Sequence, residues 1–196
     1  MASTKKEILD QALDLFSEKG YHGTSIREIA AAVGIKGSSL YNHFEGKEAI
    51  FNQLFKELAP LDLKENKFQQ KFKTDNLNPV EVLNFFGEVV LEEMRDQKKI
   101  KLLQMMLKEN NNPVVQQKIK QRMESNIRRA AEFFTRLQQE DKIISESDPL
   151  FIANEFVSGL IYYRMRFLLF KFDSYQELAA SSQKHIDFFW KNIKKV

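Results

Sequence analysis

Residues 25–44 read SIREIAAAVGIKGSSLYNHF, and this segment predicts two short helices joined by a tight turn. Ser25 and Glu28 have the spacing of a capping box, which begins a helix. Gly34 can then turn the chain through a left-handed backbone conformation. The second helix is expected at 37–43, and nearly all of its side chains are small or hydrogen-bonding. Two such helices make a helix-turn-helix, which can lay its second helix in the major groove of DNA.

The polar second helix offers two kinds of contact to DNA. Its small residues let the backbone approach base edges, and its hydrogen-bond donors can reach phosphates on either side. The residues that we predict to bind DNA are Thr24, Ser25, Lys36, Gly37, Ser38, Ser39, Tyr41, Asn42, His43 and Lys47. From this pattern alone, an ordinary three-helix packing unit with solvated polar residues remains an alternative.

A longer motif surrounds this segment. Its positions are Ile8-Leu9-Asp10-x-Ala12, Phe16-x-x-Lys19-Gly20-Tyr21-x-x-Thr24-Ser25-Ile26-x-x-Ile29-Ala30, Gly34-Ile35, and Leu40-Tyr41-Asn42-His43-Phe44-x-x-Lys47-Glu48. With these residues the chain closely resembles the tetracycline-repressor-like (TetR/AcrR) bacterial transcription regulators. Lys36 replaces the capping Ser usual in that family, and Gly37 stands where Lys or Arg is common. An operator sequence therefore does not transfer from the family.

The resemblance implies an all-α protein with two domains. Residues 1–47 would form an N-terminal three-helix helix-turn-helix DNA-binding domain, and residues 48–196 a C-terminal helical ligand-binding and dimerisation domain. The function implied is a transcriptional regulator, most often a repressor, that binds a palindromic DNA operator as a homodimer. A small apolar effector would release it from the DNA.

Composition agrees with a helical chain. Seven Gly and four Pro in 196 residues leave few helix breakers. We expect helices at 4–19, 25–33, 37–43, 47–59, 79–96, 99–109, 113–140, 149–171 and 175–194, and the sequence leaves 61–78 undecided. The net charge of +3 is too small to indicate a nucleic-acid partner by itself, so a DNA site must be a local patch.

Several other classes of protein are disfavoured. The absence of Cys and the presence of three His argue against a metal site, and we expect no cofactor. The first residues contain no apolar signal core, which favours a cytoplasmic location. In the apolar stretch 151–172, Arg164, Arg166 and Lys171 interrupt a membrane span, so we expect no membrane partner.

Catalysis and protein binding are the remaining alternatives for the first domain. Ser38 or Ser39 near His43 supplies a nucleophile and a base, but no acid partner or Gly-rich oxyanion turn is visible, so we expect no enzyme. A protein-binding module that has lost DNA binding would be favoured if Lys47 and Tyr41 were buried or paired away from solvent.

The second domain carries two predicted sites. The last two helices should form the dimer interface, because those helices usually pair as a four-helix bundle in the family, and the residues predicted there are Leu160, Phe167, Ile186 and Phe189. The effector pocket should be lined by Phe86, Met106, Phe134, Phe156 and Tyr163, although Met and Phe are also ordinary core residues. Arg164 and Arg166 either meet a ligand carboxylate, reach the surface, or pair across the dimer.

Overall fold

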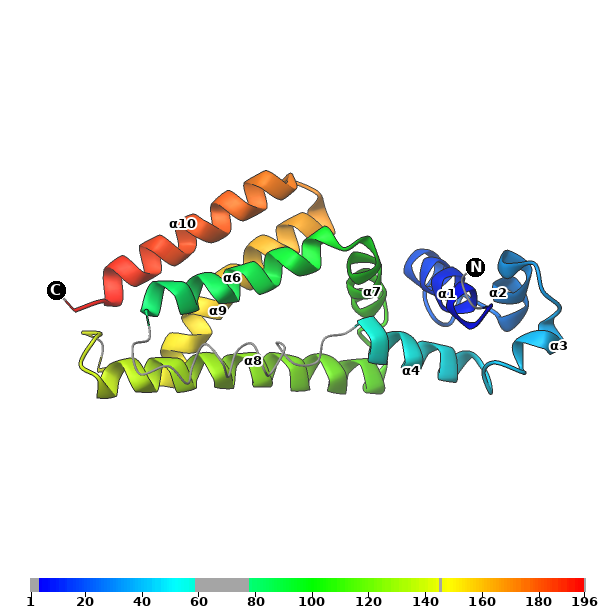
Figure 1. Ribbon diagram of the computed structural model, residues 1–196, viewed down its shortest axis with the longest axis horizontal. Helices are drawn as coiled ribbons and strands as arrows, with labels where there is room; N and C mark the ends of the chain where they lie inside the picture. The colour runs from blue at the N-terminus through cyan, green and yellow to red at the C-terminus, as the bar shows by residue number, and fades with distance from the viewer. Residues whose placement is uncertain (1–3, 59–77, 145, 196) are drawn as a thin grey trace. The chain divides into compact units, whose positions relative to one another are not determined.

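The computed structural model describes residues 4–58, 78–144 and 146–195, and these are helical apart from turns and one isolated bridge between Ile143 and Lys194. Figure 1 shows the helices in chain order. The chain divides into two compact units, of which the first comprises residues 1–60 and 96–116 and the second residues 61–95 and 117–196. An all-α fold is therefore confirmed.

The first unit is a cluster of short helices around one apolar core. Its helices are α1 (Thr4–Lys19), α2 (Ile26–Val33), α3 (Gly37–Leu40), α4 (Lys47–Leu58) and α7 (Gln97–Lys108). Helix α1 contacts α2, α4 and α7. Its apolar stripe, which includes Ile8, Leu13 and Phe16, is buried against them.

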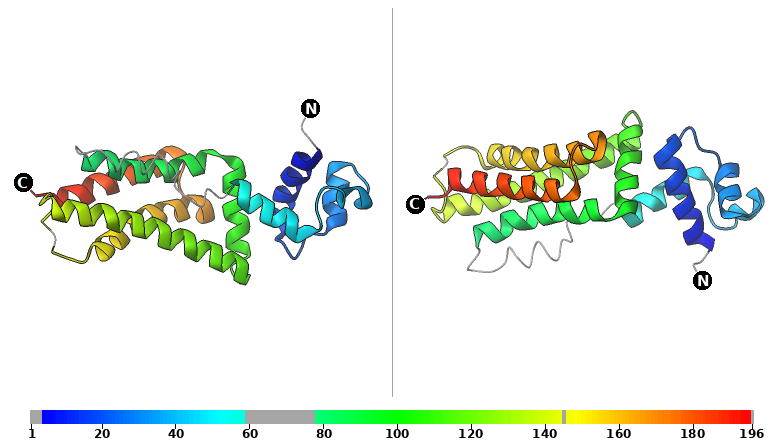
Figure 2. Two further views of the ribbon diagram at one scale, coloured as in Figure 1. Left: turned by 60° about the horizontal axis from the view of Figure 1, so that its bottom comes forward. Right: turned by 90° about the horizontal axis from the view of Figure 1, so that it is seen from above.

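The second unit consists of longer helices. They are α6 (Pro79–Arg95), α8 (Pro113–Gln139), α9 (Pro149–Met165), the π-helix η1 (Arg166–Phe170) and α10 (Tyr175–Ile193). The first turn of α8, up to residue 116, belongs to the first unit. Helix α10 lies beside α6 and α9 in both views of Figure 2. The interior between the helices is mainly aromatic and aliphatic, with Phe133, Phe134 and Phe156 fully buried.

The predicted start and stop signals of the helix-turn-helix are confirmed. Ser25 and Glu28 form a reciprocal capping box at the start of α2. Gly34 ends that helix with φ of 79° and ψ of 25°, in the left-handed region that favours glycine. A second capping box, between Ser174 and Glu177, begins α10.

Two helix ends differ from the sequence prediction by more than two residues. The helix expected at 37–43 ends at Leu40, because the amides of Asn42 and His43 bond three residues back rather than four, which tightens the chain into turns. The helix expected at 149–171 is α-helical only to Met165 and continues as η1. The undecided stretch 61–78 lies outside the described residues except for Asn78.

The compact units and the predicted domain boundary do not coincide. Helices α4 and α7 pack in the first unit, although the expected DNA-binding domain ends at residue 47. Lys47 is the first residue of α4, so the predicted boundary falls within the first compact unit. The helical scaffold that supports the helix-turn-helix includes two segments that are distant in the sequence.

Candidate nucleic-acid interface

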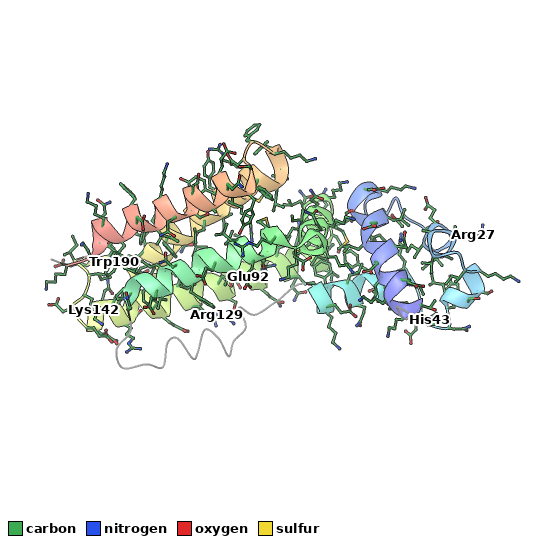
Figure 3. The ribbon with its side chains drawn as sticks, turned by 45° about the horizontal axis from the view of Figure 1, so that its top comes forward. Arg27, His43, Glu92, Arg129, Lys142 and Trp190 are labelled. Carbon is green, nitrogen blue, oxygen red and sulfur yellow. The ribbon has the colours of Figure 1, made fainter. Side chains whose placement is uncertain are left out.

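The surface of α3 and the turn after it is polar and accessible. Leu40 and Phe44 point into the core and fix this segment to the first unit. Between and before them the side chains of Lys36, Ser38, Tyr41, Asn42 and His43 are exposed, while Gly37 and Ser39 are half-buried. Tyr41 is 58% exposed. Seven of the ten predicted DNA-binding residues thus form one continuous polar surface, on which Figure 3 labels His43.

Thr24 and Ser25 lie at the start of α2 in different surroundings. Thr24 is only 2% exposed, and its hydroxyl donates to the carbonyl of Gly20 at 2.9 Å. Its side chain is therefore not available to DNA in this conformation. Ser25 is exposed, but its hydroxyl and amide both bond to Glu28, at 2.9 and 2.8 Å. Its first role is to begin the helix.

Lys47 is held by the protein itself. Its ammonium donates to the carbonyls of Tyr21 and Thr24, at 2.6 and 2.7 Å, and lies 4.3 Å from the centre of the Tyr21 ring. An ammonium has three N–H donors, so these two bonds leave one for a phosphate. Lys47 thus links the start of α4 to the turn between α1 and α2 through hydrogen bonds.

Helix α7 carries a row of charges that sequence reasoning missed. Lys98 pairs with Asp10, and Lys101 bonds Asp14 at 2.5 Å. At the last residue of α7, the Lys108 ammonium donates to the carbonyls of Ser17 and Glu18, at 2.5 and 2.7 Å. A cation at the last carbonyls of α1 also suits the negative end of the helix dipole. The three lysines recur at spacings of three and seven, which in the sequence already indicated one helix face.

The same row ends at a buried carboxylate. Glu109 accepts the amide N–H of Tyr21 at 2.7 Å, and His22 lies 3.8 Å from its other oxygen. Burial and the charges of Glu48 and Glu109 raise the pKa of Tyr21. The turn between α1 and α2 is therefore fixed from two sides, by Glu109 after α7 and by Lys47 at the start of α4.

The predicted pocket residues divide between the two units. Phe86, Phe134 and Phe156 meet in the second unit, with ring centres 5.8 Å apart for Phe86 and Phe156 and 6.0 Å apart for Phe134 and Phe156. Tyr163 is half-buried, with its ring 6.3 Å from that of His185. Met106 belongs to the first unit, where it is buried in α7. In this conformation Phe86, Phe134 and Phe156 are core residues, and the Phe156 ring packs against the rings of the other two.

Two of the predicted dimer residues are also core residues. Leu160 and Ile186 are each 2% exposed and belong to the apolar cluster of the second unit, so they are not available to a partner chain. Phe189 packs against the rings of Phe134 and Phe156, at 5.8 and 5.2 Å, and is half-buried, as is Phe167. The 3.6-residue period identified the apolar side of each helix but not which part of it faces outward.

The exposed apolar residues of the last two helices were missed by the sequence reasoning. On α9 they are Leu150, Phe151 and Tyr162, and the last two share one face with Glu155 and Ser158. On α10 the exposed aromatic is Phe188, at 68%. Next to it in the sequence, Phe189 packs on Phe156 of α9, and the contact between the two helices is on this inner side.

The second unit also encloses a charged cluster. The Glu93 carboxylate of α6 is paired with Arg122 of α8, and Arg164 of α9 lies 3.3 Å from its other oxygen. Burial and the neighbouring Arg122 lower the pKa of Arg164, and Glu93 opposes this shift. Arg164 thus pairs inside its own protomer. Arg166 bonds Asp173 at 2.8 Å.

The described residues contain neither of two other kinds of site. No group of three or more His, Asp or Glu side chains there is arranged to hold a metal ion. No helix in the described ranges is long and apolar enough to cross a membrane, which includes the segment from Phe151 onward.

Comparison with known proteins singles out the first unit. Residues 8–54 match the model of the tetR family of bacterial regulatory proteins. The biofilm operon icaADBC HTH-type negative transcriptional regulator IcaR of Staphylococcus aureus (strain Newman) is 52% identical over 52 residues, which are 26% of this chain and 28% of IcaR. IcaR of Staphylococcus epidermidis is 49% identical over 49 residues, 25% of this chain and 26% of that protein. The match thus spans about a quarter of these relatives.

Solved structures extend the likeness to the whole fold. NalD, the secondary repressor of the MexAB-OprM multidrug efflux pump in Pseudomonas aeruginosa, has a TM-score of 0.76 at 18% identity, over 98% of this chain and 96% of NalD. AibR, solved in complex with isovaleryl coenzyme A and operator DNA, has a TM-score of 0.69 at 23% identity, over 97% of this chain and all of AibR. Over residues 8–54 the chain thus carries the segment that the model of the tetR family of bacterial regulatory proteins describes, and over its whole length it shares the fold of these solved regulators.

Proposed function

We propose that the protein is a transcriptional repressor that binds operator DNA through α3 and the turn that follows it. The observation that carries this proposal is the coincidence of two features over residues 8–54. The chain is 52% identical to a negative transcriptional regulator over 52 residues, and the segment that matches the tetR-family model presents an exposed polar surface on the second helix of a helix-turn-helix. The small Gly37, Ser38 and Ser39 would approach base edges, and Lys36, Tyr41 and His43 would contact phosphates.

The alternative, a protein-binding module that has lost DNA binding, is supported by one of its two diagnostic residues and opposed by the other. Lys47 is paired within the protein, as that reading requires, but Tyr41 is exposed beside Lys36 and His43. A surface rich in donors suits a phosphate backbone. We therefore favour DNA as the partner, in a cytoplasmic regulator with no catalytic role.

The repressor would act as a homodimer on an inverted repeat. A two-fold symmetric dimer presents two identical DNA-binding domains, so its operator has half-sites related by the same symmetry. The exposed aromatic face of α9 and α10, defined by Phe151, Tyr162 and Phe188, supports a four-helix interface there. This assignment replaces Leu160 and Ile186, which the protomer's own core already contains.

A small effector bound in the second unit would release the repressor from DNA. This proposal is supported by AibR, a protein of the same fold that is solved in complex with isovaleryl coenzyme A and operator DNA. The effector can act only through a difference in its affinity for the DNA-bound and released conformations. Residues near Phe86, Phe134 and Phe156 would then have to separate to admit it, because their rings are in contact here.

Selection of DNA fragments from a random library tests the DNA-binding proposal directly. The purified full-length protein should enrich an inverted repeat, and its affinity for that repeat should fall steeply with salt because phosphate contacts release counterions. The doubly substituted variant Tyr41→Ala, His43→Ala should bind weakly while it remains folded. Enrichment of no common sequence, or equal binding by this variant, would contradict the proposed role of the α3 surface.

A further inference from the structure

The second unit contains a cluster of charged side chains in which positive charge exceeds negative charge. Its members are Arg122, Glu93 and Arg164. Two guanidinium groups meet one carboxylate, and the exposed fractions of the side chains are 12% for Arg122, 4% for Glu93 and 19% for Arg164. A charge removed from water is stable only when it is paired and hydrogen-bonded. In the described part of the chain Glu93 supplies the ion pairs of both arginines, so one positive charge is left over.

Arg164 has a donor that is not used. Its terminal nitrogen contacts Glu93, but its buried Nε–H has no hydrogen-bond partner. Leaving a donor of a charged group unbonded away from water is unfavourable, and native structures rarely retain such groups without a reason. An anion placed against Arg164 would use this donor and neutralise the surplus charge.

Apolar residues continue from this cluster along the same helices. Val90 precedes Glu93 on α6 by three residues, and Val157 precedes Arg164 on α9 by seven, which places each on the same side of its helix as the charged residue. Both are only partly buried and pack against the core that contains Phe86, Phe134 and Phe156. A ligand held at the guanidinium groups would therefore extend along an apolar wall.

We propose that Arg164 and Arg122 bind the carboxylate of an amphipathic organic acid, whose apolar body lies against the adjoining wall of α6 and α9. Glu93 holds the two guanidinium groups in position when the acid is absent and competes with it for them. This assignment rests on the proposed effector response of the second unit and names the chemical class of the effector. It also replaces a purely apolar ligand with an acid.

The test uses pairs of ligands that differ in charge alone. The thermal stability of the full-length protein is measured with octanoate and octanamide, and with phenylacetate and phenylacetamide, and binding is then measured by calorimetry. At least one acid should bind and raise the melting temperature, and its amide should not. Equal effects of acid and amide in both pairs would overturn the proposal, as would inorganic phosphate stabilising the protein as much as the acids do.

Three variants locate the binding. Arg164→Gln should weaken the active acid about tenfold or more, because charge-assisted hydrogen bonds are lost, and Glu93→Gln should tighten it by a similar factor, because the competing carboxylate is removed. Arg128→Gln, at an exposed position of α8, is the control and should change nothing. If Arg164→Gln and Glu93→Gln shift the affinity in the same direction, the cluster is a structural ion pair only. Circular dichroism confirms that each variant is folded.

The test separates this inference from the proposed function. DNA binding is measured first without any acid, so loss of the acid effect with intact operator binding would reject only the acid site. Acid binding that Arg164→Gln removes, in a protein that selects no operator, would reject the repressor instead.

Discussion

Lys36 and Lys47 are two basic residues beside α3 with different partners. Lys36 is exposed at the start of α3 and makes no capping bond, whereas Lys47 donates to two backbone carbonyls. We expect Lys36→Ala to lower the slope of log affinity against log salt concentration by about 1. The free energy of unfolding should stay unchanged. Lys47→Ala should instead destabilise the protein by about 1.5 to 3 kcal/mol, since hydrogen bonds to a charged group are lost.

Chemical unfolding and DNA titration at several salt concentrations measure both effects. A Lys47→Ala protein with unchanged stability and a reduced salt slope would show that Lys47 acts on phosphate rather than on the turn at residues 20–24. The sequence could not distinguish the two lysines, because the carbonyls that hold Lys47 are more than 20 residues away along the chain.

Glu28 makes the stability of the first unit depend on pH. Hydrogen bonds from Lys19 and from Ser25 lower its pKa from 4.5 to about 2. A carboxylate with a lowered folded-state pKa stabilises the fold above its unfolded pKa, and this contribution is lost as the pH falls through the folded value. The difference in unfolding free energy between wild type and Glu28→Gln should thus be complete near neutral pH and shrink between about pH 4.5 and pH 2.

Urea unfolding across this pH range checks the Glu28 prediction, with Glu45→Gln at another exposed carboxylate as the control. Because the Glu28 side chain is 40% exposed, the effect should be modest and should weaken in high salt. If the difference in unfolding free energy between wild type and Glu28→Gln stayed constant down to pH 2, the capping hydrogen bonds would not depend on the ionised Glu28 carboxylate.

Close packing of α9 on α10 depends on Gly159. A methyl group there would lie 2.3 Å from the His185 ring, which stacks on Phe156 and bonds the Phe156 carbonyl through Nε2 at 2.8 Å. We expect Gly159→Ala to destabilise the protein by about 1 to 3 kcal/mol through overpacking, although Ala is the better helix former. Thermal unfolding measures it, and Ser158→Ala, at an exposed neighbour on α9, is the control.

A double-mutant cycle identifies the cause. If the clash with the ring is responsible, Gly159→Ala with His185→Ala should be more stable than the two separate effects predict. Additive effects would instead indicate a change within α9 alone.

Helix boundaries were largely predictable, since they depend on local chemistry. Ser25, Gly34 and Ser174 begin or end their helices through contacts within a few residues, and the sequence identifies them. The environment of a helix face was not predictable in the same way. Leu160 is core and Tyr162 is exposed two residues later, and only the positions of the neighbouring helices decide between them. The buried pairing of Glu93 with Arg122 and Arg164 joins three helices and has no local signal.

At the scale of the whole molecule, operator binding should require a dimer formed by the exposed face of α9 and α10. Phe188→Asp or Tyr162→Asp places a charge on that face without entering the protomer core, so the variant should remain folded but become monomeric. Loss of a central aromatic contact typically costs an interface about 2 kcal/mol or more, and a charge should cost further. Each monomer would still read a half-site, but affinity for the inverted repeat should fall sharply, because the second head no longer binds with the first.

Sedimentation measures the oligomeric state, and DNA titration measures affinity for the inverted repeat in the same samples. Phe172→Asp is the matched control. Phe172 is 69% exposed but lies in the connection between η1 and α10, so its charge should leave both properties unchanged. Leu160→Asp, in the core, should unfold the second unit and is distinguished by its circular dichroism. If Phe188→Asp and Tyr162→Asp both sediment as dimers and bind the full repeat like wild type, the interface lies on another face of the chain.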